Sequence, residues 1–203
     1  MKKIIGILSA LILFSGCSTS RFSISFQEPG FNIATLKTTP IVIVGGPTVT
    51  LKEFKKSYNN VYNSDAAFMI DLTRKLWNGF GAAGFDVSTN NSIEAYNSIQ
   101  NPSSNFTTKN NAKIAICIRN VTIDEVIQQG AAQPGMPATR TSSCSIDIFA
   151  DIIDLSSGKL LTSLSAGENA GVSFFAYETA LRDAIDKACG LFVNSLSGGN
   201  GKQ

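Results

Sequence analysis

The most regular pattern in the chain is an alternation of apolar and polar residues with period two. It occurs in residues 112–125, where Ile114, Ile116 and Ile118 share one face, and again in residues 142–155. Because successive side chains of a strand point to opposite faces, both segments are predicted to be strands with one buried face. In the second segment the apolar face consists of Cys144, Ile146, Ile148, Ala150 and Ile152.

Shorter runs add further strands to this prediction. Residues 40–46 form a β-branched run closed by two glycines, which is typical of a buried strand. Residues 160–166 follow a tight turn at 154–159 and are expected to pair with the preceding strand as a hairpin. Two more short strands are expected, at residues 21–26 on a sheet edge and at residues 85–87.

Helical periodicity is found in two long segments. Apolar residues recur about every four positions between residues 65 and 80, and Ser64 or Asp65 can cap this helix. A similar apolar stripe predicts a helix at residues 175–196, and a short helix is expected at residues 92–99. The two long stripes consist of Phe68, Leu72, Leu76 and Phe80, and of Tyr177, Leu181, Ala184, Ala188, Leu191 and Phe192.

The elements follow one another as strand, helix, strand, short helix, three strands and helix. Each strand shows one apolar face, which the two long helices can cover. The predicted fold is therefore an α/β two-layer sandwich, in which a mixed β-sheet is covered by two long helices. The expected divisions are a leader at residues 1–16, a polar tether at 17–38, a single α/β domain at 39–197 and a flexible tail at 198–203.

The leader has the pattern of an export signal. Two lysines precede an apolar run at residues 4–14, and the small residues Ser15 and Gly16 lead to Cys17. This run is shorter than the roughly 20 residues that span a bilayer as a helix. The pattern resembles the lipobox of bacterial lipoproteins, although Phe14 stands where Leu, Val or Ile is usual. The resemblance implies a lipoprotein signal peptide, cleavage before Cys17 and lipid on the Cys17 thiol.

The same resemblance indicates where the protein is held. Burial of acyl chains contributes about 0.8 kcal/mol per methylene, so a multiply acylated terminus anchors a protein without a membrane span. Ser18 follows the cysteine, whereas an aspartate there commonly retains lipoproteins in the inner membrane of two-membrane bacteria. We therefore expect the cell outer membrane as location, with the domain on the periplasmic face and membrane lipid as the first partner.

Composition excludes several classes of function. Loss of Lys2 and Lys3 with the leader lowers the formal net charge from +2 to 0, so no nucleic-acid partner is expected. The chain has no histidine, which excludes Ser-His-Asp and Cys-His nucleophiles and histidine-based zinc sites. We expect no cofactor, no metal site and no small-molecule substrate.

The cysteines that follow Cys17 are odd in number, so at most one disulfide can form among them. Cys117 lies in an apolar strand and Cys189 in an apolar helical stripe, which predicts that both are buried as small hydrophobic residues. If a disulfide forms, Cys144 is the expected member, and its partner stays open.

The order of elements resembles a periplasmic α/β fold. Residues 84–87, Gly-Phe-Asp-Val, end a helix, and residues 148–161 read Ile-Phe-Ala-Asp-Ile-Ile-Asp-Leu-Ser-Ser-Gly-Lys-Leu-Leu across a turn. These features are similar to the amino-terminal domain of the Tol system's β-propeller protein, the curli secretion-channel lipoproteins and the lipoprotein activators of penicillin-binding proteins. The turn from Asp154 to Lys159 is the most specific feature, and the resemblance covers residues 40–196.

The resemblance to the curli channel does not include its membrane-inserting hairpins. The first corresponding segment, residues 126–141, contains Pro134 and Pro137 and lacks the alternation that a membrane strand needs. The second, residues 167–173, is too short for two membrane strands of about 9–11 residues each. The chain is therefore not expected to form a pore by itself.

The favoured function is a non-catalytic, membrane-anchored lipoprotein. It would dock on a cell-envelope protein complex, for example in assembly, peptidoglycan synthesis or secretion, and support or regulate it. Residues 126–141 are the predicted contact loop, with Gln128, Gln129, Met136 and Arg140 as binding residues. A hairpin connection without a binding role is the alternative.

Two other classes of function remain open. The first is an oligomeric secretion or assembly component of the curli-channel type, in which self-association replaces the envelope partner. The second is an envelope enzyme. Asp147 and Asp151 share a strand face, but at about 3.3 Å per residue they lie some 13 Å apart, too far to share a proton. Gly45, Gly46 and Pro47 lack the Lys-Ser/Thr ending of a phosphate loop.

Overall fold

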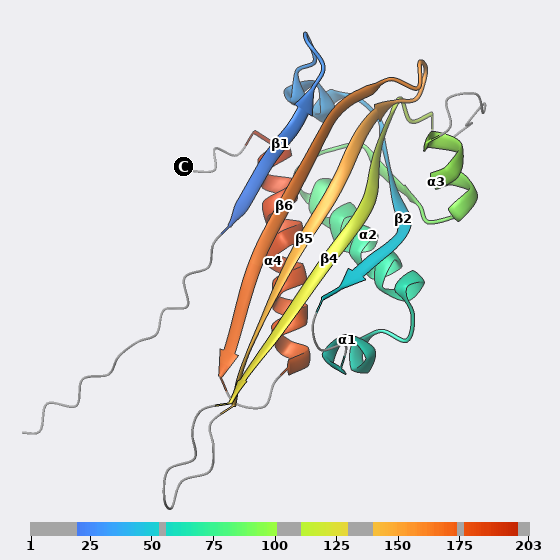
Figure 1. The fold of residues 1–203 in the computed structure, drawn as a ribbon. Coiled ribbons are helices and arrows are strands. Elements are labelled where there is room, and N and C mark those ends of the chain that lie inside the picture. Colours follow the sequence, from blue (N-terminus) through green and yellow to red (C-terminus); the bar gives the residue numbers. More distant parts are fainter. Residues whose placement is uncertain (1–19, 53–55, 101–110, 130–139, 174–176, 199–203) are drawn as a thin grey trace, which may run out of the picture.

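The computed structural model describes residues 20–52, 56–100, 111–129, 140–173 and 177–198. Its strands are β1 (Arg21–Gln27), β2 (Ile41–Leu51), β3 (Val87–Asn90), β4 (Ile114–Gln129), β5 (Arg140–Asp154) and β6 (Leu160–Ser173). Its helices are the 3₁₀ helix η1 (Ile33–Thr38), α1 (Lys56–Val61), α2 (Asp65–Ala82), α3 (Ile93–Gln100) and α4 (Tyr177–Leu196). The strands form one sheet in the order β1-β6-β5-β4-β2-β3 (Figure 1).

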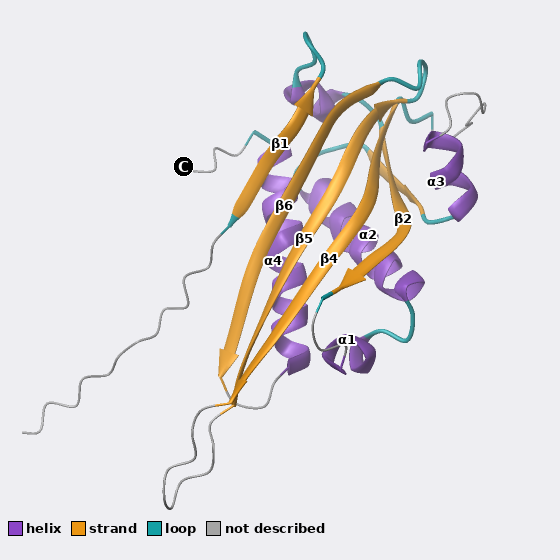
Figure 2. Ribbon diagram, in the orientation of Figure 1, coloured by secondary structure: helices purple, strands orange, loops and turns teal. Residues whose placement is uncertain are grey.

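The sheet is mixed, and its two faces are covered differently. β2 pairs in parallel with β3 and β4, and the other neighbouring strands are antiparallel. Helices α2 and α4 cover one face, which we call the helix face; α2 packs on β2 and β3, and α4 packs on β5 and β6 (Figure 2). The opposite face, the open face, is covered by α3 beside β2. The predicted α/β class and the two covering helices are confirmed.

The stripe of α2 forms the centre of the core. The Ser64 hydroxyl caps the helix by accepting a hydrogen bond from the Ala67 backbone N–H at 3.2 Å. Gly84 follows the helix with a positive φ of 84°, a conformation that glycine adopts without steric cost. The apolar positions four residues apart are fully buried, namely Phe68, Leu72, Leu76 and Phe80.

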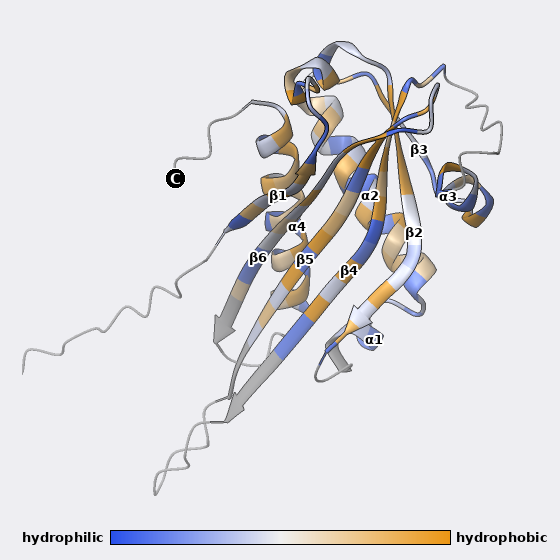
Figure 3. Cartoon of the chain, turned by 45° about the horizontal axis from the view of Figure 1, so that its top comes forward, coloured by the Kyte–Doolittle hydropathy of each residue, from blue (hydrophilic) through white to orange (hydrophobic). Residues whose placement is uncertain are grey.

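A bulge in β4 keeps apolar residues on the helix face along its length. Ile118 pairs with Ala150 and Asn120 pairs with Phe149, so Arg119 is an extra residue. The bulge reverses the phase of the alternation, and Val121 and Ile123 are buried on the same face as Ile118. Hydrophobic and hydrophilic bands alternate along the central strands (Figure 3).

The strand predicted to stop at the glycines continues beyond them. β2 runs to Leu51, with a register shift between Gly45 and Thr48 opposite the bulge of β4. A Cβ atom on Gly46 would lie 2.4 Å from the backbone carbonyl oxygen of Ile118, so only glycine permits this approach. Pro47 is tolerated because it stands where the ladder is interrupted.

The central strands are longer than the predicted boundaries. β4 extends to Gln129 and β5 begins at Arg140, so both ends of the predicted contact loop 126–141 belong to strands. β6 extends to Ser173 rather than to residue 166. These ends are rich in Ser, Gln and Gly, which give little strand signal, and antiparallel pairing with neighbouring backbone determines their structure.

The domain begins earlier than the predicted boundary at residue 39. β1, expected as a short edge strand at 21–26 inside the tether, pairs with β6 from Arg21 onward. Leu36 in η1 is fully buried in the core. The part of the tether that the structure describes is therefore part of the domain, and the leader and Cys17 lie outside the described residues.

The turn between β5 and β6 is fixed by one carboxylate. Asp154 Oδ1 accepts hydrogen bonds from the backbone N–H groups of Ser156 at 2.8 Å and Ser157 at 2.9 Å. Gly158 has a positive φ of 67°, and Lys159 pairs with Glu28 at 2.7 Å. The turn from Asp154 to Lys159 is thus a hydrogen-bonded Asx turn, and the pair of Lys159 with Glu28 attaches it to the segment after β1.

We expect Phe80→Ala to lower the free energy of unfolding by about 3–5 kcal/mol. Phe80 is fully buried and makes edge-to-face contacts with Phe85 and Phe192, so its removal leaves a cavity between α2 and α4. Ile70→Ala on the exposed side of the same helix is the control and should change stability by less than about 0.5 kcal/mol. Urea unfolding followed by circular dichroism measures both; equal losses would contradict the predicted packing.

Asp154→Ala should destabilise the protein by about 1 kcal/mol at neutral pH. Burial alone would raise the pKa of Asp154, but hydrogen bonds from Ser156 and Ser157 outweigh it and lower the pKa below its ordinary value. This contribution is present above about pH 4 and is lost as pH falls through the lowered folded-state pKa. The difference between wild type and variant in urea unfolding should therefore shrink in acid. Asp183→Ala, which removes an exposed helix pair with Lys187, should show no comparable loss at neutral pH.

Candidate partner-binding site

Three of the four predicted binding residues lie at one end of the long central strands. Gln128 and Gln129 end β4 and Arg140 begins β5, and the backbone register pairs Gln129 with Arg140. Met136 lies outside the described residues. The structure thus brings Gln129 and Arg140 together at the base of the connection between β4 and β5.

The central strands project beyond their neighbours at this end. β2 ends at Leu51 opposite Ile123, and β1 begins at Arg21 opposite Gly167. Past these points, within the described residues, only β4, β5 and β6 continue (Figure 1). We call this part, residues 124–129, 140–145 and 169–173, the three-stranded extension.

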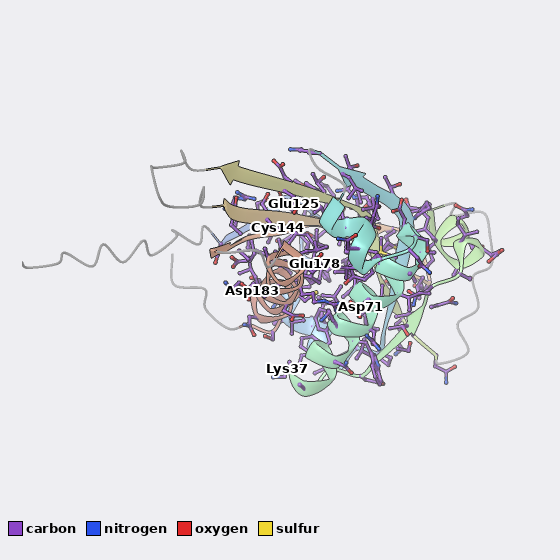
Figure 4. The ribbon with its side chains drawn as sticks, turned by 90° about the horizontal axis from the view of Figure 1, so that it is seen from below. Lys37, Asp71, Glu125, Cys144, Glu178 and Asp183 are labelled. Atoms are coloured by element: carbon purple, nitrogen blue, oxygen red, sulfur yellow. The ribbon has the colours of Figure 1, made fainter. Side chains whose placement is uncertain are left out.

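The helix face of this end carries buried acidic residues that the sequence did not indicate. Glu125 and Glu168 are both buried, and Cys144 pairs with Glu125 across β4 and β5 (Figure 4). Burial raises the pKa of Cys144 to about 12, and the charges of Glu125 and Asp124 add to the effect. Unbroken alternation from Ile118 would turn Glu125 to the open face, and the bulge turns it inward instead.

The open face carries a fixed guanidinium near its centre. Arg119 Nε lies 3.0 Å from Asp151 Oδ2, and Ser163 donates a hydrogen bond to the other carboxylate oxygen. Asp151 is buried, whereas 42% of the Arg119 side chain is exposed. The buried carboxylate therefore holds a cationic group in a defined position that solvent or a partner can reach.

A second ion pair lies across β6 on the same face. Arg21 Nη2 lies 3.0 Å and 3.2 Å from the two carboxylate oxygens of Asp147. The pair passes over Gly167, where an added Cβ would lie 2.0 Å from Asp147 Oδ1. Glycine at position 167 is thus required for β1 to be joined to β5 by a charge pair.

The two aspartates considered for acid–base chemistry are not paired with each other. Each has its own arginine, Arg21 for Asp147 and Arg119 for Asp151.

Two of the buried thiols are not nucleophiles at physiological pH. Burial raises the pKa of the Cys117 and Cys189 thiols to about 12, with small added effects of nearby charges, so both are neutral thiols at physiological pH. Within the described ranges, no three His, Cys, Asp or Glu residues cluster as metal ligands.

The described cysteines are free and buried. Cys117 and Cys189 pack among apolar side chains, as predicted, in the clusters on the open and helix faces respectively. Cys144 is also a free thiol, so the structure shows no disulfide among these three residues.

Comparisons with known proteins give structural matches only. No family model and no curated protein matches the chain. A homolog of a neuraminyllactose-binding hemagglutinin from Helicobacter pylori is 12% identical, covers 88% of this chain and 92% of its own, and has a TM-score of 0.48. The PelC dodecamer from Paraburkholderia phytofirmans is 11% identical, with 86% and 96% covered and a TM-score of 0.38.

A minor lipoprotein from Acinetobacter baumannii is also similar, at 12% identity and a TM-score of 0.31, over 76% of this chain and 91% of its own. Lipoproteins are thus among the similar structures, and at these values the likeness assigns neither family nor function. No described helix combines the length and apolarity needed to span a membrane.

We expect the three buried thiols to resist modification in the native protein. Their raised pKa values keep the reactive thiolate scarce, and burial blocks the reagent. A Cys17→Ser variant treated with a chromogenic disulfide reagent at neutral pH should react slowly when folded and show all three thiols in denaturant. Fast reaction of a folded thiol, or a single thiol in denaturant, would contradict the structure.

Proposed function

We propose that this protein is a non-catalytic lipoprotein of the bacterial outer membrane, held by lipid on Cys17 with its domain in the periplasm. We further propose that it docks through the open face on a protein of the cell envelope and supports or regulates the complex to which that protein belongs. The observation that carries the docking proposal is the Arg119–Asp151 pair, a positioned cation on a sheet face that the long helices leave uncovered.

The chemistry of the open face supports a protein partner. Arginine is enriched among residues that dominate protein interfaces, because its planar group forms several directional hydrogen bonds. Phe149 and Tyr96 are half-buried, and the Tyr96 ring lies beside Gly46 under the cover of α3. Polar side chains with aromatic groups among them are typical of interfaces that form between separately folded proteins.

Self-association is the second candidate function, and the three-stranded extension favours it. Within the described residues, β4 after Ile123 and β6 after Gly167 have no strand on their outer sides. Free strand edges present backbone donors and acceptors to another chain. An oligomeric assembly component of the curli-channel type would use such edges, and its mass in detergent would be a multiple of the protomer mass.

We expect Arg119→Ala to reduce crosslinking to envelope proteins by about tenfold or more, as loss of an interface hot spot does. Arg74→Ala is the matched control, because Arg74 also pairs with an aspartate, Asp71, but lies on the exposed side of α2. The measurement is photo-crosslinking in cells, followed by purification of the lipidated protein and identification of its partners. Equal partner yields from the two variants, or crosslinks to lipid alone, would refute docking through the open face.

The anchor is tested separately from the docking surface. Mass spectrometry of the protein from cells should find Cys17 as the first residue with acyl chains attached.

The docking variant needs a folding control as well. Circular dichroism of the Arg119→Ala variant must match wild type, because the substitution leaves buried Asp151 without its arginine. In the mass spectrometry of the wild-type protein, a bare Cys17 thiol or an intact leader would refute the anchor.

A further inference from the structure

The edge strand β1 exposes apolar side chains next to the proposed anchor. Ile24 is 41% and Phe26 is 40% exposed, although large apolar residues on a sheet edge favour unwanted association. Arg21 is the one charged residue of β1, and it is neutralised by Asp147. No carboxylate of this strand would therefore repel an anionic lipid surface.

A bulge places the two apolar residues on opposite sides of the sheet edge. Ile24 pairs with Leu164, which faces the core, whereas Phe26 pairs with Ser163, whose hydroxyl bonds Asp151 on the open face. The register shift between them places the two side chains on opposite faces of the strand. A flat surface that meets the sheet edge-on would contact both.

The chain between Cys17 and β1 is too short for the sheet to stand upright on a membrane. Arg21 is four residue steps after Cys17, which allows a span of at most about 14 Å. Arg21 pairs with Gly167, Gly167 with Asp147 and Asp147 with Thr122, so Arg21 and Thr122 lie at the same height along the strands. Gln129 lies seven residues beyond Thr122 on β4, a distance of about 23 Å. If the strands lay along the membrane normal, the three-stranded extension would reach further than the tether allows and would enter the bilayer.

The composition of the extension forbids that position. Its described residues include Gln128, Gln129 and Arg140, together with the buried acid Glu125. Charged and amide groups are costly in hydrocarbon, and open strand edges do not occur there. The strands must therefore lie nearer to the membrane plane, and the tether leaves the domain from its β1 edge.

We propose that the β1 edge rests on the membrane that holds the acyl chains, with Ile24 and Phe26 in the headgroup region. This inference rests on the proposed lipid anchor at Cys17. The contact is shallow, because the outer backbone groups of β1 need water or headgroups as hydrogen-bond partners. The open face and helix face then stand upright on the membrane, and both stay accessible to proteins.

Tryptophan quenching in vesicles tests this orientation. The chain has one tryptophan, Trp77, which is 44% exposed on α2, and α2 lies over β2 and β3 near the other edge of the sheet. Lipidated full-length protein is placed in phosphatidylethanolamine–phosphatidylglycerol vesicles whose acyl chains are brominated. We expect Phe26→Trp in a Trp77→Phe background to lose most of its emission, whereas the wild-type protein, with Trp77 as matched control, keeps its emission.

The outcomes separate the orientation from the anchor. If the variant floats with the vesicles and neither tryptophan is quenched, the orientation is wrong and the anchor stands. If the protein does not float, the anchor is wrong and the orientation falls with it. A blue-shifted but unquenched Trp at position 26, with a doubled mass in detergent, would show a second copy on β1 and overturn the proposal. Urea unfolding of each variant verifies that the fold is retained.

Discussion

The register of β4 determines how the rest of the sheet is built, because β4 pairs in parallel with β2 and antiparallel with β5. One inserted residue, Arg119, changes the phase of its alternation, so that Ile118 before it and Val121 after it both face the helices. Arg119 itself follows Ile118 and so lies on the opposite face, where Asp151 holds its guanidinium. Gly46 on β2 makes room for the bulge, since no Cβ fits against the Ile118 carbonyl. Core closure and open-face chemistry thus depend on one backbone irregularity.

The two faces of the sheet and its β1 edge have different roles. α2 and α4 bury the helix face, where the larger of the two hydrophobic clusters lies. On the open face each of two aspartates has an arginine as its ion-pair partner, and both arginine side chains stay partly exposed. The β1 edge carries the residues nearest to the proposed lipid. A domain arranged in this way has room for a partner on one face while its other face maintains stability, which fits the proposed role as an anchored docking module.

The sequence was sufficient to predict elements whose structure is set by local pattern. The stripe from Phe68 to Phe80, the one-sided strand from Cys144 to Ile152 and the turn at Asp154 were found from spacing alone. It did not reveal features set by distant pairing. Polar strand ends such as Gln128 are held by Thr141, and β1 is held by β6, which no local signal shows. The ion pair of Arg119 with Asp151 was missed because the register between β4 and β5, which brings the two residues together, cannot be read from either strand alone.

The pairing of β1 with β6 has a consequence for the order of folding. Ser23 and Ser165 share a hydrogen bond although 142 residues separate them, whereas β5 and β6 are joined by a tight turn. Contacts between distant residues form late, because closing a long loop costs more entropy than closing a short one. In a chain made from its amino terminus, β1 must wait until nearly the whole domain has been synthesised before its hydrogen-bonding partner exists. The first strand of the sheet is therefore the last to be paired, and its apolar residues Ile24 and Phe26 stay without a neighbouring strand until β6 has been made.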